Sequence, residues 1–442
     1  MFNHGAAPYI TTALFALTYI GLAIGKVPGL RLDRAGIALV GAILMLITGM
    51  LSLSQAVATD SIDYKTLALL FGMMIVIGSL RLSGFFQRLA ATALGHISTP
   101  MGLLAATVLL TGVLSAFLIN DIVCLTLTPL VLHLARRLRF DPVPHLVALA
   151  TAANIGSTGT ITGNPQNIFI GSHSGISYLR FTERLLPVAL IGLVLDFLVI
   201  AVVYRRSLRA GMRPAVQGPP ENGAVAGKGP AAELLADDEL DPDSPTDQRE
   251  RRWLQRKSVV VTLAAVVLFF TGLPLEMVAL GAAAVMLFGR IEPEQVYRKI
   301  DWGLLVMFTG LFIVVHAFQV HVVASWGIDG WSWLLRRPVD LLSLVSAGLS
   351  NLVSNVPAVL LMQPMMKAVP EAGRETAWLA LAMSSTFAGN LTVLGSVANL
   401  IVVESARREG LHISFWEYCK VGLPTTVLTL ALGIAWLEFV RY

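Results

Sequence analysis

The chain has 442 residues, of which 55% are hydrophobic and only 14% are charged, whereas soluble domains carry about 25% charged residues. This composition excludes an ordinary soluble domain, and the continuously apolar runs exclude a membrane β-barrel, whose strands would alternate polar and apolar residues. The net charge of +4 reflects basic cytoplasmic loops and does not call for a nucleic-acid partner. Two cysteines, Cys124 and Cys419, are too few for a disulfide framework or a thiolate metal site.

Apolar runs of roughly 20 residues are long enough to cross a bilayer as helices. The sequence predicts ten such spans, at 8–25, 35–52, 64–82, 144–170, 185–204, 258–273, 275–290, 302–323, 376–403 and 421–439. The predicted fold class is therefore an all-α polytopic membrane protein.

Two further apolar stretches, 101–132 and 339–366, are too long for one straight span. A helix of that length would measure about 45 Å, against a hydrocarbon core of about 30 Å. Both stretches carry polar residues near the middle, Asn120-Asp121 in the first and Ser354-Asn355 in the second. Backbone leaves a helix at membrane depth only inside protein or beside water. We therefore predict re-entrant hairpins within 101–136 and 339–369, whose polar tips meet at mid-membrane.

Residues 205–257 separate two halves, 1–204 and 258–442, and hold 10 of the 32 Lys and Arg and 9 of the 28 Asp and Glu. Six prolines and five glycines accompany these charges, which is typical of a disordered tether; a regulatory site is the alternative. If this linker is cytoplasmic, the predicted spans place 24 Lys and Arg inside and 8 outside, as the positive-inside rule requires. Both termini are then expected to face outward.

The two halves resemble each other at a nearly constant displacement. Gly41 and Gly49 match Gly281 and Gly289 at 240 residues, and the segment 163–167 matches 395–399 at 232. Each half contains five predicted spans and one hairpin. Because an odd number of crossings places the two copies in opposite orientations, we predict inverted repeats with broken helices at mid-membrane, an arrangement of secondary transporters.

The predicted spans 144–170 and 376–403 are rich in Gly, Ser, Thr and Asn at their centres, where a helix would break. Broken half-helices direct their free backbone groups at whatever lies between them, and amide and hydroxyl side chains would complete the shell around a small polar solute. The alternative is that these small residues only allow close helix packing. The predicted substrate-binding residues, including the hairpin tips, are Asn120, Asn154, Ser157, Thr158, Asn164, Asn167, Ser354, Asn355, Asn390, Thr392, Ser396 and Asn399.

Ionisable residues within spans are costly and mark functional sites by default. Asp121 lies at a predicted hairpin tip, and we predict that it is the proton- or cation-coupling carboxylate. Asp196 is a second candidate, with a helix-to-helix hydrogen bond as the alternative role. Asp63 and Asp301 open their spans and are expected to cap them. The absence of a phosphate-binding loop and of an acid, base and nucleophile set favours an ion-driven transporter over an enzyme.

The segments Leu118-Ile119-Asn120-Asp121, 153–160, Gly163-Asn164-Pro165-Gln166-Asn167 and 354–358 resemble the ion-transporter superfamily over essentially the whole chain. Within it the chain is most similar to the arsenite permease and NhaD-type sodium/proton antiporter branch, which is related to sodium/dicarboxylate symporters. The resemblance implies a scaffold domain, a transport domain that moves as an elevator, and a homodimer. The dicarboxylate symporters carry Ser-Asn-Thr at both tips, where this chain has Asn120-Asp121-Ile122 and Ser354-Asn355-Val356.

A site that is rich in amides and hydroxyls, with one carboxylate and no Arg or Lys, favours a small neutral hydroxylated solute over a multivalent anion. We therefore expect proton-coupled efflux of arsenite or antimonite, with no cofactor other than a coupling H⁺ or Na⁺. Sodium/proton exchange and an inorganic or organic anion permease are the alternatives; a channel would lack saturable counterflow. The expected location is the bacterial inner membrane, with a soluble ATPase or metallochaperone as a possible partner.

Overall fold

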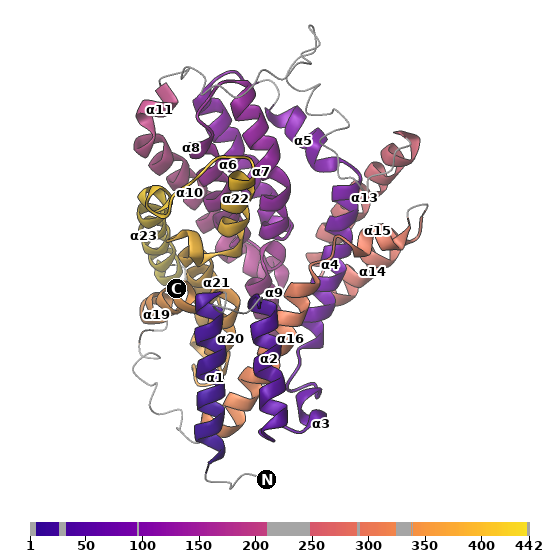
Figure 1. Cartoon of the computed structure of the whole chain (residues 1–442), viewed down its shortest axis with the longest axis vertical. Coiled ribbons are helices and arrows are strands. Elements are labelled where there is room, and N and C mark those ends of the chain that lie inside the picture. The colour runs from indigo at the N-terminus through magenta and orange to yellow at the C-terminus, as the bar shows by residue number, and fades with distance from the viewer. Residues whose placement is uncertain are drawn as a thin grey trace.

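The structure is a computed structural model that describes residues 6–25, 32–94, 97–209, 248–289, 292–323, 337 and 339–439. These residues form helices joined by turns and short loops, with no strand among them, which confirms the predicted all-α class. Figure 1 shows the helices gathered into one bundle, from which α1 and α2 extend together at the end where the N-terminus lies. Most of the predicted linker, residues 210–247, lies outside the described residues.

The first half contains α1 to α11. Their bounds are α1 Ala7–Ile24, α2 Arg34–Ile47, α3 Leu53–Ala56, α4 Tyr64–Leu82, α5 Phe85–Leu94, α6 Pro100–Phe117, α7 Asn120–Arg137, α8 Pro142–Ser157, the 3-10 turn η1 Ile161–Gly163, α9 Pro165–Ser174, α10 Tyr178–Val203 and α11 Arg205–Arg209.

The second half contains α13 to α23. Their bounds are α13 Gln248–Phe269, α14 Leu275–Leu287, α15 Pro293–Tyr297, α16 Trp302–Phe318, the π-helical turn η3 Gln319–Val323, α19 Asp340–Val353, α20 Asn355–Met366, α21 Glu371–Ala388, the 3-10 turn η5 Val393–Gly395, α22 Val397–Arg408 and α23 Phe415–Phe439.

Six helices in the described part of the chain are long and apolar enough to cross a membrane. They are α1, α4, α6, α10, α16 with η3, and α23. Several helices begin earlier than the apolar runs predicted, as α10 does at Tyr178 in place of residue 185 and α23 at Phe415 in place of 421. The first turn of α10 is polar, and Ser177 caps it by accepting from the backbone N–H of Arg180. Hydropathy alone does not register such capped polar turns.

The prediction of a disordered linker over 205–257 is wrong at both ends. Residues Arg205–Arg209 form α11, and α13 begins at Gln248, ten residues before the predicted span. The segment from 248 to 257 contains no Gly or Pro and carries good helix formers, so it extends α13 out of the apolar run. Leu254, fully buried at 1% exposure, anchors that extension against the bundle.

One group of helices, which we call the scaffold group, consists of α1, α2, α4, α13, α14 and α16. In it α2 packs on α16 and α4 packs on α14, while α1 lies on α2 and α16 and α13 lies on α14 and α4. Both central pairs depend on a glycine: a Cβ at Gly72 would lie 2.7 Å from the backbone of Ala279, and one at Gly310 would lie 2.7 Å from the backbone of Ala38. Each central pair therefore has one glycine at which the two helix backbones approach closely.

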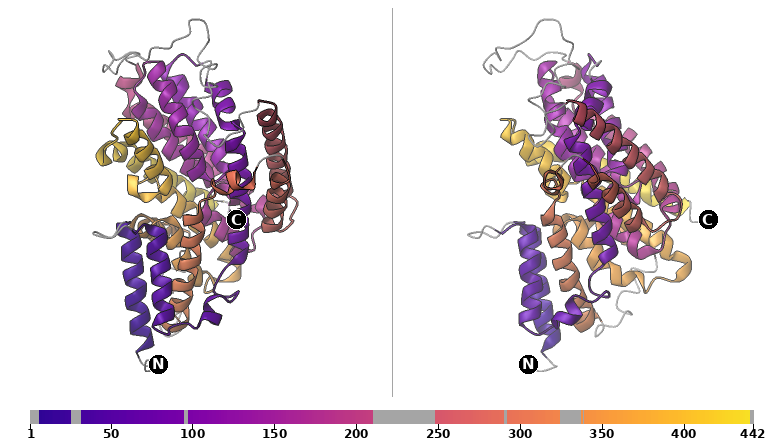
Figure 2. Two further views of the ribbon diagram at one scale, coloured as in Figure 1. Left: turned by 45° about the vertical axis from the view of Figure 1, so that its right-hand side comes forward. Right: turned by 90° about the vertical axis from the view of Figure 1, so that its right-hand side faces the viewer.

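The second group, which we call the hairpin group, contains α6 to α10 and α19 to α23 (Figure 2). Within it α6 and α7 pack on α8, α19 packs on α21, α10 packs on α23, and α22 packs on α7 and α8. The helix pairs α6–α7 and α19–α20 occupy the two segments for which the sequence predicts hairpins.

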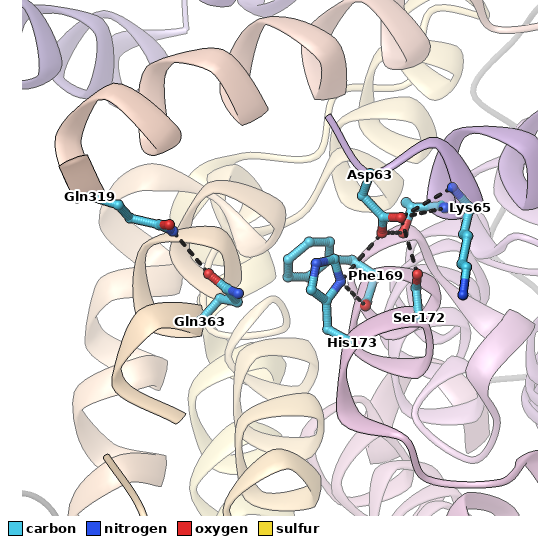
Figure 3. Close-up of polar contacts among 8 residues, drawn as sticks. Asp63, Lys65, Phe169, Ser172, His173, Gln319 and Gln363 are labelled. Atoms are coloured by element: carbon cyan, nitrogen blue, oxygen red, sulfur yellow. Dashed lines mark hydrogen bonds and ion pairs between the residues drawn. The ribbon is translucent and has the colours of Figure 1, made fainter. Parts of the chain in front are cut away.

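Polar contacts join the two groups at several places, and Figure 3 draws two of them. At the first, Asp63 caps α4 through the backbone N–H groups of Lys65 and Thr66 and also accepts from Ser172 Oγ at 3.2 Å, while His173 Nδ1 of α9 lies 3.3 Å from its Oδ2. At the second, Gln319 Nε2 donates to Gln363 Oε1 of α20 at 2.9 Å. The predicted caps at Asp63 and Asp301 are confirmed, since Asp301 accepts from the N–H of Leu304 at 2.9 Å.

Candidate functional site

Two helices of the hairpin group break in the same way. In the first, α8 ends at Ser157 and α9 begins at Pro165; in the second, α21 ends at Ala388 and α22 begins at Val397. Asn167 Nδ2 closes the first break by donating to the carbonyls of Ser157 and Thr160, at 3.1 and 3.0 Å. Asn399 Nδ2 closes the second by donating to the carbonyls of Gly389 and Thr392, at 2.7 and 3.0 Å.

Every partner in these two closures is displaced by 232 residues from its counterpart, which is the displacement predicted for the segments 163–167 and 395–399. The backbone repeats as well: Thr160 and Thr392, the residues that precede η1 and η5, are both extended, with φ of −142° and −137°. The asparagines therefore satisfy carbonyls that a broken helix would leave unpaired.

The two breaks meet at Asn154, a fully buried residue of α8. Its Nδ2 donates to Oδ1 of Asn390 at 2.8 Å and to Oδ1 of Asn399 at 3.0 Å. Its Oδ1 accepts from Asn120 Nδ2 and from Ser396 Oγ, both at 3.0 Å. One amide thus ties the tip of the first hairpin to both sides of the second break.

The hairpin tips are short. At the first, Leu118 and Ile119 separate α6 from α7, which begins with Asn120 and Asp121. At the second, Ser354 alone separates α19 from α20 and has a φ of 76°, a left-handed conformation that costs a non-glycine residue energy. The adjacent Asn355 side chain, oriented so that its amide nitrogen meets acceptors, donates to the carbonyls of Ser385 and Gly395, both at 3.1 Å.

These tips and breaks enclose a pocket between the hairpin group and the scaffold group. Its polar wall comes from both tips and both breaks, and its apolar wall from α1, α16 and the second tip. The lining residues are Leu22, Arg34, Asn120, Asp121, Pro165, Gln166, Leu304, Met307, Val353, Ser354, Asn355, Val356, Pro357, Ser396 and Val397.

Four helices of the hairpin group begin at this pocket: α7 at Asn120, α9 at Pro165, α20 at Asn355 and α22 at Val397. Each helix N-terminus presents unpaired N–H groups and roughly half a positive charge. Oxygen atoms of a bound solute would therefore meet hydrogen-bond donors on several sides of the pocket.

The expectation that no Arg or Lys lies at the site is wrong. Arg34, the first residue of α2, lines the pocket, and its Nη1 lies 3.4 Å from Ser354 Oγ as a weak hydrogen bond. It also interacts electrostatically with Asp121, which lines the same pocket. Sequence reasoning missed Arg34 because an arginine that opens a span after a polar loop has the pattern of an ordinary cytoplasmic loop charge.

Of the predicted site residues, the pocket brings together Asn120, Asp121, Ser354, Asn355 and Ser396. A second set lies behind the pocket wall. Its hydrogen bonds hold the two helix breaks in shape and join α8 to the second break. These residues are Asn154, Ser157, Thr158, Asn164, Asn167, Asn390, Thr392 and Asn399. Asp196 lies apart from the pocket, on α10 between α8 and α23. Gln166 joins the pocket lining from the 163–167 segment.

An all-helical chain with several apolar helices long enough to cross a membrane, whose broken helices and hairpin tips gather amides and hydroxyls around one polar pocket, is a polytopic membrane transporter. The chain belongs to the CitMHS citrate transporter family, whose model matches residues 19–388. This places it in the ion-transporter superfamily that the motifs predicted.

Two relatives extend the comparison over the whole chain. The silicon efflux transporter LSI3 of Oryza sativa subsp. japonica is 33% identical, covering 92% of this chain and 93% of that protein. The putative transporter arsB of Dictyostelium discoideum is 24% identical, covering 98% and 92%. Among solved structures, the Alcanivorax borkumensis YdaH transporter has a TM-score of 0.55 at 15% identity, covering 99% of this chain and 97% of that one, which shows a shared fold.

Proposed function

We propose that this protein exports a small uncharged oxyacid of the type of silicic or arsenous acid, in exchange for protons that bind Asp121. The observation that carries the proposal is the charge of the pocket. Arg34 and Asp121 are the two charged groups of its lining, and the other polar lining groups are amides and hydroxyls. With Asp121 ionised, the charges of the pocket cancel, so a neutral solute binds without an uncompensated charge.

The hydrogen-bonding groups fit a solute that carries several hydroxyls. Asn120 Oδ1 is buried and has no hydrogen-bond partner among the described residues, so it is an acceptor left for a solute hydroxyl. The helix N-termini of α9 and α22 supply donors for the solute oxygens. The names of the two relatives, a silicon efflux transporter and arsB, support an oxyacid substrate.

Asp121 supplies the coupling in this proposal. The ionised carboxylate accepts a hydrogen bond from a solute hydroxyl. After the solute has left, a proton binds the carboxylate and neutralises it, and the emptied pocket then returns to the side from which the solute came. Proton and solute therefore compete for one carboxylate, which is the simplest basis for exchange.

The second candidate function is uptake or export of an oxyanion such as citrate, and Arg34 favours it. If Asp121 is protonated, Arg34 and the four helix N-termini leave the pocket electropositive, which suits a carboxylate substrate. The description of the family as citrate transporters agrees with this candidate. In it, the proton and the substrate would bind together and would not compete.

The pH dependence of solute binding separates the two candidates. For the purified protein in detergent, we expect the affinity for silicic or arsenous acid to fall as the pH is lowered, and Asp121→Asn to remove that dependence. An affinity for citrate that rises as the pH is lowered, with no saturable binding of either oxyacid, would replace the first candidate by the second. A response to Na⁺ alone would indicate sodium/proton exchange.

The remaining features of the proposal rest on the loop charges and on the family resemblance. We place the protein in the bacterial inner membrane with both termini outside, and we propose a homodimer in which the hairpin group moves against the scaffold group as an elevator. The cycle needs a coupling ion and no other cofactor. A soluble ATPase or metallochaperone partner is an extension of the proposal that a pull-down with tagged protein would test.

A further inference from the structure

Asp196 is the second carboxylate in the apolar interior of the hairpin group. It lies on α10, its exposed fraction is 0%, and the pocket does not include it. Thr151 Oγ1 of α8 lies 2.9 Å from its Oδ2, and Thr425 Oγ1 of α23 lies 3.3 Å from its Oδ1. No lysine, arginine or histidine among the described residues forms an ion pair with it.

A count of hydrogens favours a protonated carboxyl group at Asp196. The Thr151 hydroxyl has one hydrogen, and its oxygen is also 3.0 Å from the carbonyl of Val147, the bond that a threonine in a helix ordinarily makes. If the hydroxyl donates to Val147, Oδ2 of Asp196 has to be the donor to Thr151 Oγ1. Oδ1 then accepts from Thr425, and every polar atom has a partner.

An ionised Asp196 would be far worse placed. Two hydroxyls at most would face the charge, with no cation beside it, in an apolar interior where an ionised side chain is costly. Burial of an unpaired carboxylate is therefore strongly disfavoured, and the neutral acid is the stable form.

We propose that Asp196 is a second proton-binding site of this protein, protonated in the conformation described here and linked to the state of the pocket. The link is a continuous chain of hydrogen bonds. It runs from Asn120 in the pocket wall to Asn154, from Asn154 to Asn390, and from Asn390 Nδ2 to the carbonyl of Thr151 at 3.2 Å. Thr151 in turn holds the Asp196 carboxyl group.

Among the described residues, the elements packed around α10 place no cation in an ion pair with Asp196. Helix α6 and the turn η1 contain no ionisable side chain, and Tyr418 is the group on α23 that interacts with Asp196 electrostatically. The other ionisable side chains of these elements are His145 on α8, Glu371, Arg374 and Glu375 on α21, Glu417, Cys419, Lys420 and Glu438 on α23, and Arg205, Arg206 and Arg209 on α11.

The consequence is a reciprocal linkage. If a solute in the pocket pulls on Asn120 and Asn154, the position of Thr151 changes, and with it the free energy of the Asp196 proton. Linkage then requires that the proton on Asp196 change solute affinity by the same factor. This half of the inference rests on the proposed function; the protonation of Asp196 does not.

Infrared difference spectroscopy of the reconstituted full-length protein tests the protonation without any solute. We expect the carbonyl stretch of a protonated carboxyl group near neutral pH, absent in Asp196→Asn and retained in Asp121→Asn. A spectrum in which Asp196→Asn removes only a carboxylate band would overturn the proposal, whatever the transport assays show.

Thr425→Val serves if Asp196→Asn does not fold. It removes the hydroxyl that donates to Oδ1 and leaves the carboxyl group in place. We expect the carbonyl band to move to higher frequency, because a free carbonyl is stiffer than a hydrogen-bonded one. Thr429→Val is the matched control, because the Thr429 hydroxyl bonds backbone carbonyls of its own helix, and it should leave the band unmoved.

Addition of silicic acid or arsenite to the same samples tests the linkage. We expect the Asp196 band to shift or lose intensity, and Asn390→Ala to abolish that response while the band itself persists. A band that is present but does not respond to a solute whose binding is measured in parallel would overturn the linkage. If neither oxyacid binds, the proposed function fails, and the protonation of Asp196 still stands on the spectrum recorded without solute.

Discussion

Asn154 and Asn390 lie 236 residues apart in the sequence, and the amide nitrogen of Asn154 donates a 2.8 Å hydrogen bond to the side-chain oxygen of Asn390. Both residues are fully buried. The two halves of the chain therefore meet through a pair of asparagines, one from each broken helix. The geometry of the pocket depends on this pair, because Asn154 also holds Asn120 and Ser396 of the pocket wall.

Asn154→Ala should cost both stability and transport. It leaves Asn390 Oδ1 and Asn120 Nδ2 without partners, and each buried unsatisfied group costs about 1 to 3 kcal/mol. We expect a lower Tm in detergent and loss of solute uptake into proteoliposomes. Thr309→Ala is the control, because the Thr309 hydroxyl bonds only the carbonyl of Leu305 in its own helix. A wild-type Tm for Asn154→Ala would show that the hydrogen bonds of Asn154 do not contribute to the stability of the fold.

Gly72→Ala and Gly310→Ala should destabilise the protein to a similar degree. Each added methyl group would lie 2.7 Å from the backbone of the facing helix, and such overpacking typically costs about 1 to 3 kcal/mol. Gly281→Ala is the matched control, since nothing lies within 4 Å of its would-be methyl group. Thermal unfolding of the three variants measures the effect. If Tm falls strongly in one of the variants Gly72→Ala and Gly310→Ala and is unchanged in the other, the two helix pairs of the scaffold group are not equivalent, which would count against the predicted repeat.

A covalent link between Gln319 and Gln363 should stop transport if the hairpin group moves against the scaffold group. Both residues would be replaced by cysteine in a Cys124→Ser, Cys419→Ser background and joined with a short bifunctional thiol reagent. Uptake should fall to background and return on reduction. The control pair is Arg180 and Glu375, an ion pair of 2.9 Å within the hairpin group, whose cross-link should leave uptake intact. Full uptake with the first pair linked would contradict the elevator proposal.

Arg34→Gln should weaken solute binding by roughly tenfold or more, because a charge-assisted hydrogen bond contributes about 1.5 to 3 kcal/mol. Arg34→Lys should retain part of the affinity, since it keeps the charge and loses the planar fork of donors. Lys65→Gln, which changes a cation outside the pocket, is the control. Unchanged binding in Arg34→Gln would remove this residue from the site.

The sequence predicted the helical class, both hairpin segments and both broken helices, because their residues carry the signal locally. Asn164-Pro165 disfavours a continuous helix through the proline, and the run from Gly389 to Asn399 is rich in Gly, Asn, Ser and Thr, which are poor helix formers. The sequence did not predict Arg34, which reaches the pocket only because α2 begins beside the tip at Ser354. It also could not separate residues of the pocket wall from residues behind it. Asn154 and Asn120 have the same chemistry and adjacent positions in the network, and only packing decides which one lines the pocket.

The central claim is that Asp121 exchanges a proton for a neutral oxyacid. The direct measurement is the internal pH of proteoliposomes when silicic or arsenous acid is added to one side, for the wild type and Asp121→Asn. We predict proton movement opposite to the solute gradient in the wild type. Asp121→Asn should show none, while it still exchanges labelled arsenite for unlabelled arsenite. Proton movement that is absent in the wild type, or equal in the two proteins, would contradict the account.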